Sequence, residues 1–168
     1  ETDASGGRNS VLDQIREIIN RTRRSPEGKD LAAVGLGTPG LINDRGEIIG
    51  EAVNIPGWHD FPLQETIRGC VDLPVFAAND VSLTAFGEYV NGTGRSGSVR
   101  NLVCVSVGTG IGGGLVIDGE LYLGSYGLAA EIGHLIVEPG GAACGCGQKG
   151  CLEQYASARG MVRACIEK

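Results

Sequence analysis

The chain has 168 residues, of which 42% are hydrophobic and 20% are charged, a composition that suits a folded core and argues against a disordered chain. Its 14 basic and 20 acidic residues give a net charge of −6, which disfavours broad binding to the phosphate backbone of a nucleic acid. No stretch approaches the roughly 18 consecutive apolar residues of a membrane span, so we expect no membrane partner.

The first half of the sequence alternates between helical and extended patterns. Apolar residues at helical spacing predict a helix over residues 9–22, and a second helix is expected after Pro62. Short apolar runs at 31–36 and 75–78 predict buried strands, and the second run leads directly into a helix from Asp80 to about residue 90. Strands that alternate with helices are typical of an α/β domain.

A stretch rich in glycine and serine, residues 91–100, has the composition of a linker. We therefore expect two α/β lobes, residues 1–95 and residues 96–168, and neither lobe looks complete.

The second half is rich in hairpin signals. Asp118-Gly119 is typical of a tight turn between two strands, and a closing helix is expected from about residue 152 to residue 166. The predicted strands of this half cover residues 102–107, 115–117, 120–123 and 135–137.

The six cysteines fall into two groups. Cys70, Cys104 and Cys165 stand alone in the sequence, and we expect them to be reduced core thiols. The other three lie within eight residues of one another and cannot all pair as disulfides, which favours a reducing, cytoplasmic compartment.

The second group of cysteines predicts a metal site. Three thiolates and one imidazole form a closed tetrahedral set that suits a structural zinc ion and leaves no open position for catalysis. The alternative is a loop of reduced thiols beside an unrelated histidine. The proposed ligands are His134, Cys144, Cys146 and Cys151.

Glycine is the unusual feature of the composition, because 29 of the 168 residues are glycine, about 17% against a usual share of about 7%. The densest run, Gly108–Gly114, carries Thr109 and lets backbone N–H groups approach a phosphate closely. The run matches the dinucleotide-binding pattern, but a strand and a hairpin follow it where that pattern requires a helix. A phosphate-binding loop between two strands and an ordinary glycine-rich turn both remain open.

Four polar residues complete the set of candidates. Asp80 follows a strand and opens a helix, so it is either a helix cap or a general base at the carboxyl end of a sheet, beside Asn79. Glu131 and Glu153 lie close in sequence to two of the proposed metal ligands, so a bound metal would fix both carboxylates without entering a reaction. Carboxylates are natural acceptors for sugar hydroxyls.

Taken together, these residues resemble the ROK family of bacterial sugar kinases and sugar-responsive repressors, within the actin, sugar-kinase and heat-shock ATPase superfamily. Residues 35–40 are similar to the substrate-side loop of that family, Asn79-Asp80 to its sugar-binding asparagine and catalytic aspartate, and Gly108–Gly114 to its second phosphate loop. Residues 131–134 and 144–153 match its signature almost letter for letter.

The resemblance implies an actin-like, ribonuclease-H-like fold of two lobes and an ATP-dependent sugar kinase that uses Mg²⁺ with ATP and carries a structural Zn²⁺. Asp80 would be the general base toward the attacking sugar hydroxyl. The implied sugar-binding residues are Gly40, Asn79, Asp80, Glu131, His134 and Glu153. The implied phosphate-binding residues are Gly108, Thr109, Gly110, Gly112 and Gly113.

Glucose is the expected substrate, because residues 54–58 look more like the glucokinases of the family than its N-acetylhexosamine kinases. The family alternatives are an N-acetylhexosamine kinase and the sugar-sensing domain of a repressor, and a zinc-stapled module without catalysis is a third reading. Family members often pair, so a homodimer is compatible with the resemblance. Nothing in the sequence resembles the family's first phosphate loop or its adenosine-binding segment, so we expect the chain alone to show little phosphoryl transfer.

Overall fold

The computed structural model describes residues 2–50, 52 and 54–166. It divides into two compact units, one running up to Asp80 and the other from Val81 onward. The domain boundary expected from composition, between residues 95 and 96, stays a prediction. Within the described residues, no helix is both long enough and apolar enough to cross a membrane.

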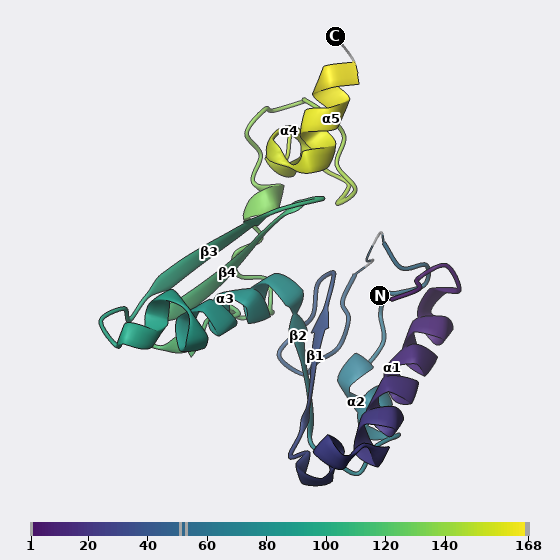
Figure 1. The fold of residues 1–168 in the computed structure, drawn as a ribbon. Coiled ribbons are helices and arrows are strands. Elements are labelled where there is room, and N and C mark those ends of the chain that lie inside the picture. Colours follow the sequence, from purple (N-terminus) through teal and green to yellow (C-terminus); the bar gives the residue numbers. More distant parts are fainter. Residues whose placement is uncertain (1, 51, 53, 167–168) are drawn as a thin grey trace. The chain divides into compact units, whose positions relative to one another are not determined.

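The first unit is built around two parallel strands. Strand β1 (Val34–Thr38) pairs with β2 (Val75–Asn79) from Val34 opposite Val75 to Thr38 opposite Asn79. The carboxyl ends of both strands therefore lie at the same edge. The helical segments of this unit are α1 (Gly7–Arg24), the short 3-10 helix η1 (Pro26–Asp30) and α2 (Leu63–Arg68), as Figure 1 shows.

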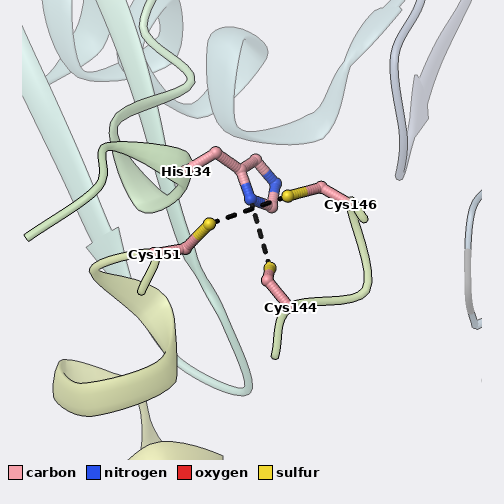
Figure 2. Close-up of side chains that lie close together, drawn as sticks. All are labelled: His134, Cys144, Cys146 and Cys151. Atoms are coloured by element: carbon pink, nitrogen blue, oxygen red, sulfur yellow. Dashed lines mark hydrogen bonds between the residues drawn. The ribbon is translucent and has the colours of Figure 1, made fainter. Parts of the chain in front are cut away.

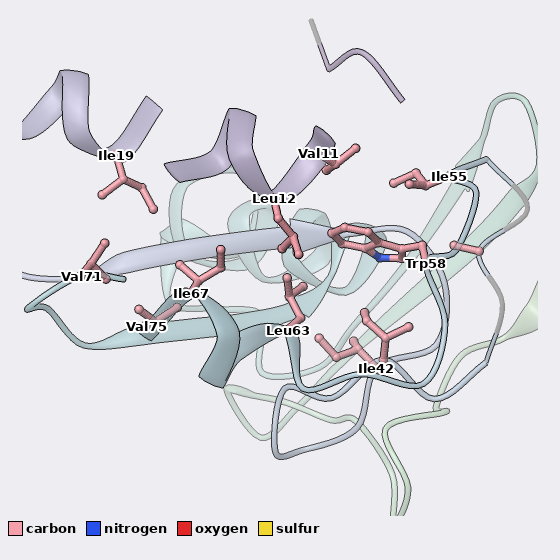
Figure 3. Close-up of a cluster of buried hydrophobic side chains, with 12 residues drawn as sticks. Val11, Leu12, Ile19, Ile42, Ile55, Trp58, Leu63, Ile67, Val71 and Val75 are labelled. Carbon is pink, nitrogen blue, oxygen red and sulfur yellow. The ribbon is translucent and has the colours of Figure 1, made fainter. Parts of the chain in front are cut away.

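One hydrophobic cluster holds the first unit together (Figure 3). It joins one face of α1 to α2, the loops after β1 and the start of β2, because each of these elements contributes buried aliphatic side chains. Trp58 lies fully inside it, packs edge-on against Phe61 at 5.0 Å, and donates a hydrogen bond of 2.8 Å from Nε1 to Thr38 Oγ1. The irregular loop around Trp58 is thereby anchored to the end of β1.

The second unit contains an antiparallel sheet with the order β3-β4-β5. Asp118 and Gly119 turn β4 into β5 with positive φ angles of 52° and 90°, which confirms the expected hairpin. The strands are β3 (Leu102–Val107), β4 (Ile111–Ile117) and β5 (Glu120–Leu121). The helices are α3 (Asp80–Asn91), η2 (Thr93–Ser96), η3 (Ile132–His134), α4 (Glu153–Ala156) and α5 (Ala158–Ile166).

The glycine run differs from its expected form. Only Gly108–Gly110 make a turn, whereas the last three glycines belong to β4 and pair with β3. A Cβ on Gly112 would lie 2.6 Å from Val81 Cγ2, and a Cβ on Gly114 would lie 2.5 Å from Ala85 Cβ, both on α3. The absence of side chains on this face of β4 allows the helix to pack closely against the strand.

Two other expectations for the second unit are wrong. Residues 135–137 form no strand, and only a single bridge joins Ile136 to Cys151. The expected closing helix is divided into α4 and α5 at Ser157, whose backbone is extended and whose Oγ accepts a hydrogen bond of 3.1 Å from Gly160 N. This serine caps α5, because its hydroxyl satisfies an amide that lacks a partner in the first helical turn.

The isolated cysteines are also placed differently from expectation. Cys70 and Cys165 are exposed and Cys104 is half-buried, so the three are not core residues. Cys70 follows the end of α2 and receives a hydrogen bond of 3.2 Å from Arg16 Nε on α1. A thiol can serve as a polar surface group as well as a buried one, and a single sequence does not distinguish the two uses.

The contact between α3 and β4 predicts opposite effects for two glycine substitutions. Gly114→Ala should lower the free energy of unfolding by about 1–3 kcal/mol through overpacking against Ala85. Gly87→Ala, in the interior of α3 with open space around the added carbon, should raise it by about 0.5–1 kcal/mol. Urea denaturation measures both, and equal effects would contradict the close packing.

Candidate functional site

One imidazole and three thiols converge in the second unit (Figure 2). His134 ends η3, Cys144 and Cys146 lie in the following loop, and Cys151 closes that loop just before α4. Their ligand atoms all lie within 4.8 Å of one another. The loop turns tightly at Gly150, with a φ angle of +84°, where a Cβ would overlap the carbonyl oxygen of residue 138.

The spacing of these atoms fits a tetrahedral zinc ion. His134 Nδ1 lies 3.6 Å from Cys144 Sγ, and the sulfur atoms of Cys146 and Cys151 are also 3.6 Å apart. With zinc bonds of about 2.3 Å to sulfur and about 2.0 Å to nitrogen, tetrahedral ligand atoms are separated by roughly 3.5–3.8 Å. The donors present therefore suit a structural metal ion with four protein ligands.

The thiols differ in acidity. Burial raises the pKa of Cys144 to about 12 and also raises the pKa of Cys151. Burial acts on Cys146 as well, but hydrogen bonds, chiefly the one from the backbone N–H of Gln148, outweigh it and lower the pKa of this thiol. Because zinc binds thiolates, metal uptake must release protons from the buried thiols, and metal affinity must fall as the pH falls.

Two carboxylates flank the His134 ring. Glu131 Oε2 lies 3.9 Å from His134 Nε2, and Glu153 Oε1 lies 3.9 Å from His134 Nδ1. Glu153 Oε1 also accepts a hydrogen bond of 3.2 Å from the Cys144 thiol. The histidine thus turns Nδ1 toward the cysteines and leaves Nε2 on the side of Glu131, so the expected neighbourhood of metal ligands and glutamates is present.

The glycine turn borders a groove. Gly108 donates a hydrogen bond of 2.9 Å to Gly110 O and accepts one of 2.9 Å from Ala158 N, the first residue of α5. Thr109 forms one wall of a groove of about 570 Å³, whose other wall is a face of α5. The α5 residues along it are Ala158, Arg159, Val162, Arg163 and Ile166. The Arg163 guanidinium donates hydrogen bonds to the side chain and backbone oxygens of Gln154, which leaves Arg159 as the cation for an anionic ligand with an apolar part.

The α5 side of this groove was not expected from the sequence. The apolar pattern of residues 152–166 predicts a structural helix and indicates no role for Arg159 or Arg163. The signal that could have pointed to them is Ser157, because a capping serine inside an apolar helical pattern marks the start of a second helix beside the glycine turn.

The remaining candidates lie in the first unit, at the carboxyl edge of its two strands. Asn79 ends β2 and donates a hydrogen bond of 3.3 Å from Nδ2 to Gly40 O. Gly40 has a positive φ of 83°, and Asp80, the first residue of α3, is exposed. The structure therefore brings Gly40 and Asn79 together, with Asp80 next to Asn79 in the chain.

A model of the ROK family matches residues 4–168. Among curated relatives, the glucokinase of Halalkalibacterium halodurans is 45% identical over 159 residues, covering 94% of this chain and 47% of the relative. An N-acetylmannosamine kinase of Escherichia coli is 39% identical over 163 residues, covering 97% and 53%. The chain thus spans about half the length of these relatives.

Two solved structures show the same fold. The ROK family glucokinase of Streptomyces griseus, in complex with glucose and AMPPNP, is 38% identical with a TM-score of 0.81, over 96% of this chain and 50% of that one. A ROK family transcriptional regulator, a homologue of the E. coli MLC protein, is 29% identical with a TM-score of 0.77, over 99% and 42%. The actin-like, ribonuclease-H-like sugar-kinase fold expected from the sequence is confirmed.

The ligand geometry predicts that Cys146→Ser abolishes tight metal binding. Metal at about a thousand times its Kd adds about 4 kcal/mol to the free energy of unfolding. Because each kcal/mol shifts the melting temperature by about 2–4 °C, loss of the metal should lower the melting temperature by roughly 10 °C. Elemental analysis and thermal melts measure both effects. Cys165→Ser, at an exposed thiol outside the cluster, is the control that should keep one metal per chain. An unchanged metal content in Cys146→Ser would show that the ligand set is wrong.

Proposed function

Because the chain belongs to the ROK family, we propose that it forms part of an ATP-dependent sugar kinase whose substrate is a hexose, with glucose the preferred one. The observation that carries the proposal is the pair of carboxylates on either side of His134, each 3.9 Å from a ring nitrogen. Such acceptors, held in place beside a structural metal site, suit the hydroxyl groups of a sugar. The glucokinase relatives support glucose.

By the family resemblance, residues for sugar binding are proposed in each unit separately. In the first unit they are Gly40, Asn79 and Asp80. In the second they are Glu131, His134 and Glu153, where the imidazole would give Nδ1 to zinc and Nε2 to the sugar. The Asn79 side chain is oriented by its hydrogen bond to Gly40 O.

Asp80 would act as the general base. It follows the last residue of β2 and lies in the first turn of α3, where the helix dipole favours a negative charge. The carboxylate would accept the proton of the sugar hydroxyl that attacks the γ-phosphate of ATP. Mg²⁺ bound with ATP would neutralise charge on the phosphate groups. The chain's own contribution is then positioning, with sugar and phosphate held in line.

The glycine turn and its groove would hold the nucleotide. We propose that the backbone of Gly108 and Gly110 and the hydroxyl of Thr109 contact the phosphates, with Arg159 in reach of the same groove. Gly112 and Gly113 lie inside β4, and their contact with phosphate stays a prediction.

The second candidate function is the sugar-sensing domain of a repressor. The likeness to a ROK family transcriptional regulator favours it, because that fold is shared over nearly the whole chain. A sensor would bind sugar at the same glutamates without using Asp80 as a base. The two functions therefore differ in turnover.

An ADP-release assay with a panel of hexoses tests the proposal. The assay uses the whole protein of which this chain is proposed to form part. We expect glucose to have the highest kcat/KM, exceeding that of N-acetylmannosamine by about tenfold or more, since a site built around one set of substituents discriminates strongly against another. Saturable sugar binding without ADP release would favour the repressor function. A higher kcat/KM for N-acetylmannosamine than for glucose would show that the preferred substrate is not glucose.

The role of Asp80 predicts a selective loss of turnover. Asp80→Asn should lower kcat by about 10²–10⁴-fold and leave the KM for sugar within a few-fold, because the amide keeps the shape and cannot accept the proton. Asp72→Asn, at an exposed loop position of the same unit, should change neither constant. A kcat for Asp80→Asn within threefold of the unsubstituted protein would exclude Asp80 as the base.

A further inference from the structure

We propose that Glu153 is a positioning residue that links the metal cluster to the glycine turn, so that the position of the turn and the geometry of the metal site depend on one side chain. The inference deepens the proposed function, and only its consequence for phosphoryl transfer rests on that function.

One oxygen of Glu153 belongs to the cluster. Oε1 accepts a hydrogen bond of 3.2 Å from Cys144 Sγ and one of 3.3 Å from Gln154 Nε2, and it lies 3.9 Å from His134 Nδ1. The side chain is only 20% exposed. Glu153 begins α4 two residues after Cys151, so its backbone is held by the same loop as the metal ligands.

The other oxygen of Glu153 faces the glycine turn. A Cβ built on Gly110 would lie 2.8 Å from Glu153 Oε2, closer than side-chain carbons approach in real proteins. Gly110 does not have a positive φ angle, so its backbone conformation does not require glycine. The carboxylate of Glu153 therefore occupies the space that a side chain at this position would need.

Gly108, in the same turn, provides the contrast. A Cβ there would meet no atom within 4 Å, and its φ angle is not positive either. An alanine at 108 adds a methyl group to open space, whereas an alanine at 110 must push the carboxylate aside.

The planar carboxylate transmits that displacement. Because its two oxygens move together, a group that pushes Oε2 also moves Oε1 relative to Cys144 and His134. With metal bound, Cys144 is a thiolate and no longer donates to Oε1, so the displacement reaches the site through the close approach of Oε1 to Cys144 Sγ and to His134 Nδ1. The clash involves the flexible end of a side chain, so Gly110→Ala should fold normally. If the turn holds phosphate and Glu153 holds a sugar hydroxyl, the same residue connects both substrates to the metal site.

Cobalt substitution tests the link without any substrate. In the intact protein loaded with Co²⁺, Gly110→Ala should shift the visible absorption of the metal and weaken its affinity, in chelator competition, by about tenfold, the scale for groups around metal ligands. Gly108→Ala, the matched control, should leave both within twofold. In a Glu153→Ala background, Gly110→Ala should change neither the cobalt absorption nor the cobalt affinity any further.

Two outcomes would overturn the inference: identical cobalt spectra for Gly110→Ala and Gly108→Ala, or a full effect of Gly110→Ala in the Glu153→Ala background.

A second measurement changes Glu153 and observes the glycine turn. Glu153→Gln should shift the backbone amide resonance of Gly110 and leave that of Gly97 unchanged, and an unshifted Gly110 amide also overturns the inference. Neither measurement uses sugar or ATP. If Gly110→Ala alters the metal site but the protein phosphorylates no sugar, the proposed kinase function is contradicted and the link through Glu153 is not.

Discussion

The convergence of an imidazole and three thiols on one point is the constraint on which the second unit depends. Among the described residues, the buried apolar side chains of this unit are few, namely Ala85, Ile111, Val116, Cys144 and Cys151, whereas the first unit has a continuous core. A bound metal ion would stabilise this unit because it cross-links distant segments and contributes folding free energy. Here it would fix η3, the cysteine loop and the start of α4 together.

The same constraint explains how a glycine-rich segment can hold functional groups in place. Glu131 and Glu153 are each within two or three residues of a metal ligand, so their backbones are positioned by the cluster. The glycine turn at 108–110 accepts a hydrogen bond from Ala158 N of α5, and Glu153 fills the space where a Cβ of residue 110 would lie. In the second unit, the groups proposed for sugar and phosphate therefore lie beside the loop that carries the thiols.

The sequence predicted those features whose signals are local. The grouping of His134 with three cysteines, the helix after β2 and the Asp118-Gly119 hairpin follow from residue types at fixed spacing. The glycines of β4 lie in a strand and not in the expected loop. Glycine is typical both of flexible loops and of strands that a helix approaches closely, and here α3 packs against the strand. The break at Ser157, the exposed Cys70 and the groove along α5 depend on tertiary contacts that no local pattern reports. The roles of Asp80 and the glutamates toward a sugar rest on the family resemblance.

X-ray absorption spectroscopy of the zinc-loaded protein measures whether the three thiols and His134 hold the metal. We expect three sulfur atoms at about 2.3 Å and one nitrogen at about 2.0 Å around each zinc ion. A shell dominated by oxygen and nitrogen, or one with only two sulfur atoms, would show that the thiols and His134 do not hold the segment together.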